Sequence, residues 1–159
     1  MNAIDQAHYR QVLGHFPTGI TVVTGMDGDE PVGLAVGSFF SLSLDPPLVG
    51  FCVGRTSSSW ARMHGAGAFC VNILGEDQED VCRVFATSGV DKFASIGWKP
   101  AETGSPLING VLAWIDCDLE VVHDGGDHHI VVGRVRGMEV GHEGSPLIFY
   151  RGGYANLAR

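Results

Sequence analysis

The sequence predicts a mostly β protein, a closed or nearly closed antiparallel β-barrel with a few short helices. Residues 113–121 alternate between apolar and polar side chains, which is typical of a strand with one buried face. Further short runs rich in β-branched residues are separated by turn sequences such as DGDEP and LDPP. Glycine accounts for 23 of the 159 residues, about twice the usual share, and follows no collagen-like period, which indicates tight turns.

The N-terminal part is expected to hold one helix and three strands. Residues 5–16 favour a helix capped by Asp5, because Tyr9, Val12, Leu13 and Phe16 recur at the spacing of one helical face. Three apolar runs follow as expected strands, at residues 20–25, 32–36 and 48–54.

The middle of the chain predicts two short helices around a strand. The first helix begins at the serines 57–59, and the strand AFCVNIL covers residues 68–74. Acidic residues at 76–80 favour the start of the second helix, because carboxylates are stabilised at the positive end of a helix dipole. Val81, Val84 and Phe85 give this helix its apolar face.

The C-terminal part shows the clearest strand pattern. Ala, Ile, Cys, Leu and Val alternate over residues 113–121 with Trp114, Asp116, Asp118 and Glu120, which are expected on a solvated face. DGGD at 124–127 then reverses the chain, and residues 129–140 return as the second strand of a long antiparallel hairpin. PLIFYRGGY at 146–154 is expected to close the chain as one last short strand, so that six to eight strands build the barrel.

Composition and charge restrict the classes of function. The chain is 45% hydrophobic and 18% charged, which excludes disorder, and its length fits one domain over residues 1–159. Ten Lys and Arg stand against eighteen Asp and Glu, a net charge of −8. Such a chain is not expected to bind nucleic acid or an anionic membrane through a general basic patch, although a local loop can bind one phosphate.

Cysteine usage and targeting signals predict a cytoplasmic protein. The four cysteines, at 52, 70, 82 and 117, form no CxxC pair, and three lie in apolar, strand-like runs. This pattern favours free, buried thiols in a reducing compartment. The N-terminus does not resemble a signal peptide, and no apolar run is long enough to span a membrane.

Several common site motifs are absent from the sequence. The nearest approach to GxGxxG, at residues 65–67, precedes a strand rather than a helix, and this excludes a Rossmann domain. No Walker A loop or GxSxG elbow is present. His128 and His129 are adjacent and point to opposite faces of a strand, so no metal site is expected. An enzyme of this kind would depend on a bound organic cofactor.

The strongest local signal is the segment GRTSSSW at residues 54–60. Arg55 is followed by the hydroxyls of Thr56, Ser57, Ser58 and Ser59 at an expected helix start, where free N–H groups and the helix dipole favour an anion. One serine would suffice for ordinary capping, which is the alternative interpretation. Four hydroxyls beside an arginine favour a phosphate site.

Five segments in this order carry a family resemblance: FPTGITVVT, GLAVGSFFSLSLDPPLVGFCVGRTSSSW, FCVNIL, DKF and GDHHIVVGRV. Together they resemble the flavin reductase-like family, the FMN-binding split barrels that act as NAD(P)H:flavin oxidoreductases. The resemblance implies a six-stranded split barrel of Greek-key type in a homodimer. It also implies FAD or FMN as cofactor, and a flavin-dependent monooxygenase that receives the reduced flavin. NADH is expected rather than NADPH, because no extra basic cluster is available for a 2′-phosphate.

The resemblance also assigns site residues. Flavin contacts fall on Thr18, Val36, Gly37, Ser38, Ser41, Cys52, Val53, Arg55, Thr56, Ser57, Ser58, Ser59, Lys92 and Phe93. Backbone N–H groups around Ser38 and Val53 are expected at the pyrimidine edge of the flavin, where negative charge develops on reduction.

His128 in the GDH motif matches the position where the nicotinamide approaches the flavin. Its alternative interpretation is a polar residue beside a tight turn. Two further hypotheses are a flavin-carrying electron-transfer module without nicotinamide turnover and a small-molecule-binding barrel without flavin.

Overall fold

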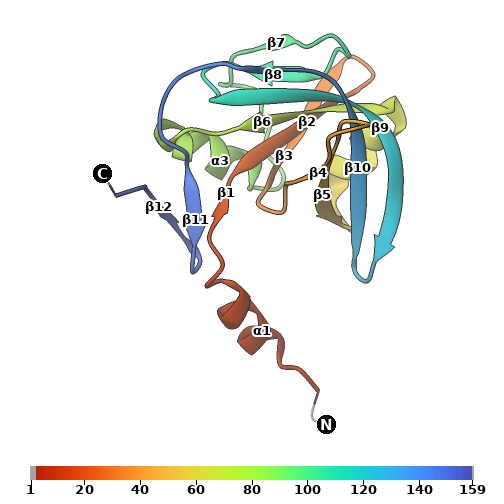
Figure 1. The fold of residues 1–159 in the computed structure, drawn as a ribbon. Coiled ribbons are helices and arrows are strands. Elements are labelled where there is room, and N and C mark those ends of the chain that lie inside the picture. Colours follow the sequence, from red (N-terminus) through yellow and green to blue (C-terminus); the bar gives the residue numbers. More distant parts are fainter. Residues whose placement is uncertain (1–2, 159) are drawn as a thin grey trace.

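A curled, seven-stranded antiparallel sheet forms the body of the molecule in the computed structural model, which describes residues 3–158 (Figure 1). The strand order is β3-β2-β6-β9-β10-β5-β4. β3 and β5 also contact one another, so the two ends of the sheet curl together. The sheet has one strand more than the expected six, because residues 40–43 add a short edge strand beside β5.

The strands of this sheet are β2 (Thr21–Asp27), β3 (Glu30–Val36), β4 (Phe40–Ser43), β5 (Leu48–Gly54), β6 (Ala68–Ile73), β9 (Ala113–Gly125) and β10 (His128–Val140). Smaller sheets hold β1 (Thr18–Gly19), β11 (Ile148–Tyr150) and β12 (Gly153–Ala155), and β7 (Trp98–Pro100) with β8 (Pro106–Ile108). The helices are α1 (Gln6–Leu13), α2 (Ser58–Met63) and α3 (Glu79–Phe85), with the 3-10 turns η1 (His64–Ala66) and η2 (Glu76–Gln78). The expected helices and main strands are therefore confirmed within a few residues at their ends.

Buried clusters pack against both faces of the central part of the sheet. Inside the barrel, Phe51, Phe69 and Met63 belong to one buried cluster, in which the rings of Phe51 and Phe69 meet edge to face at 5.1 Å. On the outer side, Phe85 of α3 and Ile108 of β8 belong to a second buried cluster against β2 and β6. Two such layers hold the strands around the site rigidly.

The prediction that the second face of residues 113–121 is solvated is wrong at its start. Asp116 is only 1% exposed, and Trp114 packs partly buried against the second cluster. The loop before β8 covers this face: Thr103 donates to both carboxylate oxygens of Asp116, from its N–H at 3.0 Å and from its hydroxyl at 2.6 Å. A buried carboxylate is tolerated there because it is hydrogen-bonded.

The expected β9–β10 hairpin is confirmed and carries the GDH turn at its tip. His128 pairs with Gly125 across the ladder, and Gly126 takes a φ of 70° in the two-residue turn. A positive φ explains the glycine at that position. β10 also pairs with β5, and this register places His128 opposite Gly54.

The C-terminal segment corrects the prediction of a single last strand. Residues 148–155 form a hairpin of β11 and β12, because Arg151 and Gly152 both take positive φ, at 49° and 77°. Two consecutive positive φ values make a tight reversal that suits antiparallel strands. β11 then pairs with β1, next to α1.

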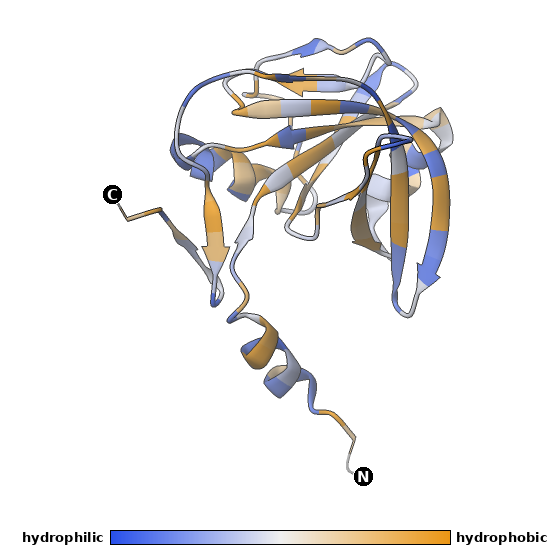
Figure 2. Ribbon diagram, viewed as in Figure 1, coloured by the Kyte–Doolittle hydropathy of each residue, from blue (hydrophilic) through white to orange (hydrophobic). Residues whose placement is uncertain are grey.

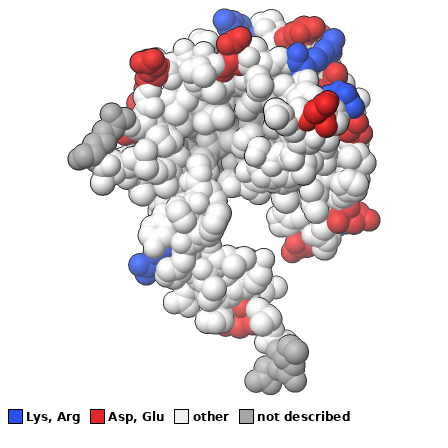
Figure 3. Space-filling model, in the orientation of Figure 1, with Lys and Arg blue, Asp and Glu red and all other residues white. Residues whose placement is uncertain are grey.

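Helix α1 projects from the barrel as an arm (Figure 1). Asp5 caps it as expected, accepting from Ala7 N–H at 3.1 Å, but the helix ends at Leu13 and none of its residues is buried. Its apolar residues Tyr9, Val12 and Leu13, together with Phe16, lie exposed. Figure 2 shows hydrophobic residues in orange on this helix. In the view of Figure 3, charged side chains gather on the rim of the barrel, and the surface beside the arm is almost free of them.

No helix in residues 3–158 is long and apolar enough to cross a membrane.

Candidate functional site

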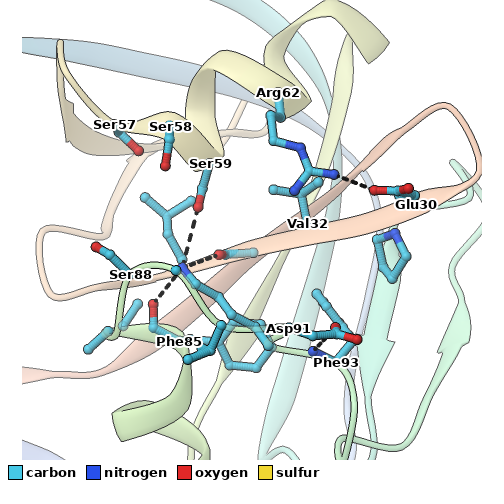
Figure 4. Close-up of a pocket in the computed structure, with 18 of the residues that line it drawn as sticks. Glu30, Val32, Ser57, Ser58, Ser59, Arg62, Phe85, Ser88, Asp91 and Phe93 are labelled. Carbon is cyan, nitrogen blue, oxygen red and sulfur yellow. Dashed lines mark hydrogen bonds and ion pairs between the residues drawn. The ribbon is translucent and has the colours of Figure 1, made fainter.

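A groove of about 1140 Å³ opens between the start of α2, strand β3 and the loop that follows α3 (Figure 4). Thr56, Ser57, Ser58 and Ser59 line one side of it. Ser57 caps α2, because its hydroxyl accepts from Trp60 N–H at 3.2 Å. The capping interpretation is therefore correct for one serine. The hydroxyl-bearing residues Thr56, Ser58 and Ser59 also line the groove.

Lys92 fastens this groove together. Its ammonium donates to the carbonyl oxygens of Gly33 and Phe85, both at 3.1 Å, and to the Ser59 hydroxyl at 3.3 Å. The three dashed lines that converge on one nitrogen in Figure 4 are these bonds. Partial burial lowers the pKa of Lys92. Because Lys92 has three N–H groups and three acceptors, it leaves the Ser59 O–H directed elsewhere and free to donate to a ligand.

Arg62 closes another side of the groove. Its guanidinium bonds Glu30 at 2.7 Å and Asp27 at 3.0 Å, and the Glu30 contact is drawn in Figure 4. Phe93 lies on the opposite wall and meets the ring of Phe85 edge to face at 5.0 Å. The groove therefore has polar donors at the α2 end and aromatic packing beneath the loop.

A second, smaller groove of about 560 Å³ lies between β1 and the loop from β3 to β4. Thr18, Gly37 and Ser38 line it, as expected for flavin contacts, together with the apolar residues Phe16, Phe39 and Phe40. A Cβ on Gly37 would lie 3.2 Å from the Thr18 hydroxyl, so this loop approaches β1 closely. Residues 30–35 line the larger groove and residues 37–40 the smaller one, so the two grooves follow one another along the chain.

Five expected flavin-contact residues line neither groove with their side chains, namely Arg55, which is described below, and four others. Val36 and Val53 are buried in the barrel core, and Ser41 and Cys52 lie on β4 and β5 outside both grooves. The Ser38 hydroxyl accepts from Cys52 N–H at 2.8 Å and donates to Cys52 C=O at 2.9 Å. Because backbone groups alternate in direction along an antiparallel strand, Val53 N–H then points to β10. The structure therefore offers Gly54 N–H, rather than Val53 N–H, on the edge toward Ser38.

Gly54 forms a bare patch on the sheet. A Cβ added there would meet no atom within 4 Å, and Gly54 stands directly opposite His128 in the β5–β10 ladder. Directly opposed residues point to the same face, so His128 stands beside this patch. No side chain covers the strand at this point, which comes just before the hydroxyl-bearing residues 56–59 in the chain.

His128 is fixed by its neighbour. Its Nδ1 lies 2.8 Å from the Asp127 carboxylate, and this contact lowers the pKa of Asp127. The Nε2 edge of the ring is therefore left to face a ligand. His129 points to the other face of β10, opposite the buried Val53.

Arg55 does not lie where the sequence predicts. It lines neither groove, because its side chain turns to the β9–β10 hairpin. Its Nε donates to Gly126 C=O at 2.7 Å and its Nη2 to Asp124 Oδ1 at 2.7 Å, and the Asp124 contact lowers the pKa of that carboxyl. Arg55 N–H donates to Asp127 C=O at 3.0 Å.

Comparison with known proteins decides the family. The model of the flavin reductase like domain matches residues 13–158. The chain belongs to the flavin reductase family. A flavin reductase from Pseudomonas putida is 51% identical over 158 residues, which are 99% of this chain and 93% of that protein. Reductase subunit HsaB of a flavin-dependent monooxygenase from Rhodococcus jostii (strain RHA1) is 50% identical, over 98% of this chain and 80% of the subunit.

Solved structures agree. The NADH:FAD oxidoreductase SgcE6 of Streptomyces globisporus C-1027, in complex with NAD and FAD fragments, superposes with a TM-score of 0.92 at 36% identity. The match covers 99% of this flavin reductase and 98% of that chain. The family and the mostly β antiparallel fold predicted from the sequence are both confirmed.

Three features of this flavin reductase site were not predicted from the sequence, because no motif marks them. The loop at 86–91 and Arg62 line the larger groove, and Gly54 leaves the bare patch. The glycine was visible as the last residue of an apolar run, but its partner His128 lies on a distant strand. Within residues 3–158, no group of three or more His, Cys, Asp or Glu side chains is placed to hold a metal ion.

Proposed function

We propose that this flavin reductase transfers hydride from NADH to FAD and supplies reduced flavin to a separate flavin-dependent monooxygenase. The observation that carries the proposal is the bare patch at Gly54, which stands opposite His128 in the ladder and comes two residues before the hydroxyls that line the larger groove. NADH and FAD are proposed by analogy with SgcE6, an NADH:FAD oxidoreductase. The monooxygenase partner is proposed by analogy with HsaB, the reductase subunit of a flavin-dependent monooxygenase.

The residues of the two grooves fit a flavin nucleotide. Thr56, Ser58 and Ser59 offer hydroxyl donors for phosphate oxygens. A groove of about 1140 Å³ is large enough for a ligand of this length, since small-molecule sites typically measure about 300–1,000 Å³. Gly37, with Ser38 and Gly54 N–H, lets the backbone approach a flat ring. FMN would use the same phosphate donors, and FAD is preferred here for the extra volume.

The bound flavin supplies the hydride acceptor. With both molecules bound, the protein would contribute mainly by positioning them, because hydride transfer needs close, aligned rings and little acid or base help. Gly54, which carries no side chain, leaves the strand uncovered beside His128. His128, with Nδ1 held by Asp127, presents Nε2 to the amide side of the nicotinamide as a positioning hydrogen-bond partner.

The oligomer and the location belong to the same proposal. The exposed apolar face of α1 lies beside β11, where the rings of His15 and Tyr150 meet edge to face at 6.4 Å. This surface suits a second copy of the chain, and we propose a homodimer. Four free thiols, three of them buried, support the cytoplasm as the compartment.

The decisive experiment is steady-state oxidation of NADH, followed by absorbance, with FAD, with FMN and without added flavin. Flavin-dependent NADH loss, faster with FAD, supports the proposal. Tight flavin binding without NADH oxidation would instead identify an electron-transfer module, and absence of both would leave a barrel for another ligand. NADPH in place of NADH tests the choice of nicotinamide.

A further inference from the structure

Arg55 joins two parts of the molecule that are far apart in sequence. It follows directly after Gly54, where β5 leaves the sheet, and the turn it contacts lies about seventy residues further on. Arg55 donates three hydrogen bonds to this hairpin end, to Asp124, Gly126 and Asp127. None goes to the hydroxyls of residues 56–59.

Beyond the strand ladders on either side, these contacts are what restrain the side chains of the turn. The side chains of Asp124 and Asp127 are 88% and 96% exposed, so little packing restrains them. Gly126, with a φ of 70°, contributes no side chain at all. The planar guanidinium is suited to this position, because the Nε and Nη2 groups of one edge reach a carbonyl and a carboxylate at once.

His128 is the first residue after this turn, and its ring is held by Asp127 within the turn. We propose that Arg55 is a positioning residue, which fixes the turn at residues 124–127 and thereby holds His128 beside the bare patch at Gly54. His128 and the segment at residues 54–59 would then keep a fixed relative position. This inference rests on the proposed function. It replaces the phosphate role that the sequence suggested for Arg55.

The geometry separates the two roles of Arg55 experimentally. If Arg55 bound a flavin phosphate, its removal would weaken flavin binding. If Arg55 instead fixes the turn, its removal would raise the KM for NADH and leave flavin affinity nearly unchanged. Arg55→Met keeps most of the side-chain stem and removes the guanidinium. We expect it to raise the KM for NADH about fivefold or more, because small displacements of a positioning group are costly. The flavin dissociation constant should stay within about twofold.

A second readout needs neither flavin nor NADH. In the flavin-free protein, Arg55→Met should speed amide hydrogen exchange at Gly126, Asp127 and His128, while residues 68–73 of β6 keep their protection. Arg55→Lys should restore part of the protection, since its ammonium can reach one of the two acceptors but lacks the two parallel N–H groups of the guanidinium.

The matched control is Arg134→Met. Arg134 lies on the same hairpin, pairs with Glu120 at 3.2 Å and has a similarly exposed side chain, but it does not contact the turn. It should leave both readouts unchanged. Asp124→Asn provides a second variant that does not endanger the fold, and the double variant Arg55→Met with Asp124→Asn should be no worse than Arg55→Met alone.

The outcomes are distinct. If Arg55→Met lost flavin affinity but kept its KM for NADH, the positioning role of Arg55 would be wrong and binding of the flavin phosphate by Arg55 would be supported. Unchanged exchange at the turn, or equal effects in Arg134→Met, would also overturn it. If the unmodified protein failed to oxidise NADH with either flavin, the proposed function would fail, while the exchange experiment would still decide whether Arg55 holds the turn.

Discussion

The hydroxyl of Ser38 satisfies both backbone groups of Cys52, accepting from its N–H at 2.8 Å and donating to its C=O at 2.9 Å. A side chain here takes the place of a neighbouring strand, just before β4 begins at Phe40. The loop that carries Gly37 is thereby tied to β5. This contact sets the edge on which Gly54 N–H is exposed, and so it shapes the floor of the proposed flavin site.

Ser38→Ala should therefore reduce both stability and flavin binding. Two lost hydrogen bonds correspond to about 1–2 kcal/mol in the free energy of unfolding, measured by urea denaturation. Flavin affinity, measured by fluorescence quenching, should fall as the loop loosens. Ser41→Ala, on the exposed side of neighbouring β4, should change the unfolding free energy by less than about 0.5 kcal/mol. Equal destabilisation by the two variants would contradict this account.

Local patterns were sufficient to predict most of the fold. The alternation at 113–121 and the DGGD turn give the β9–β10 hairpin, and Asp5 gives the start of α1. Predictions failed where a partner lies far along the chain. The residue pattern could not show that Thr103 covers Asp116, nor that the hairpin turn holds Arg55. The site was predicted in the same way: the serines at 57–59 carry a local signal, whereas the Gly54–His128 pairing depends on strand register.

Gly54→Ala tests the bare patch directly. Nothing lies within 4 Å of the added Cβ, so stability should be unchanged or rise by about 0.4–1 kcal/mol through the unfolded state. Flavin affinity should fall at least several-fold, because the methyl group occupies the space of the ring. Gly133→Ala is the opposite case: its Cβ would collide with the ring of Phe69, and thermal unfolding should occur at a lower temperature. Undiminished flavin binding by Gly54→Ala would move the ring away from this strand.

The arm formed by α1 predicts a dimer that one charge can disrupt. Val12 and Leu13 are 51% and 52% exposed, although they lie on the apolar face of the helix. In sedimentation experiments at micromolar concentration the protein should have about twice the mass of one chain. Leu13→Asp should shift it to the mass of one chain, since a buried unpaired carboxylate opposes association. Gln11→Asp, on the other side of the same helix, should remain dimeric, and a dimer that survives Leu13→Asp would place the interface elsewhere.

Asp127 should show its contact with His128 in a carboxyl titration by NMR. The hydrogen bond to His128 holds the pKa of Asp127 below its usual value of about 3.9. Because the pKa of Asp127 is lowered, its contact with His128 is fully present at pH values above the usual carboxyl pKa. The contact is lost as the pH falls through the lowered pKa of Asp127. His128→Ala should raise the midpoint of Asp127 toward the usual value. Asp124, whose pKa is lowered mainly by Arg55, should keep its low midpoint in that variant, and a parallel rise of both would show that the two contacts are not independent.

The pair His128 and His129 offers an internal comparison for the nicotinamide site. His128 stands beside the patch at Gly54, and His129 stands opposite Val53 on the other face of β10. His128→Ala should raise the KM for NADH and lower kcat/KM about tenfold, equivalent to about 1.4 kcal/mol of transition-state stabilisation. Flavin affinity should change little, because the flavin contacts proposed above lie on β5, the residue 37–38 loop and the hydroxyls. His129→Ala should leave the kinetics nearly unchanged. If both variants behave alike, or if His128→Ala loses flavin and keeps its KM for NADH, His128 does not seat the nicotinamide.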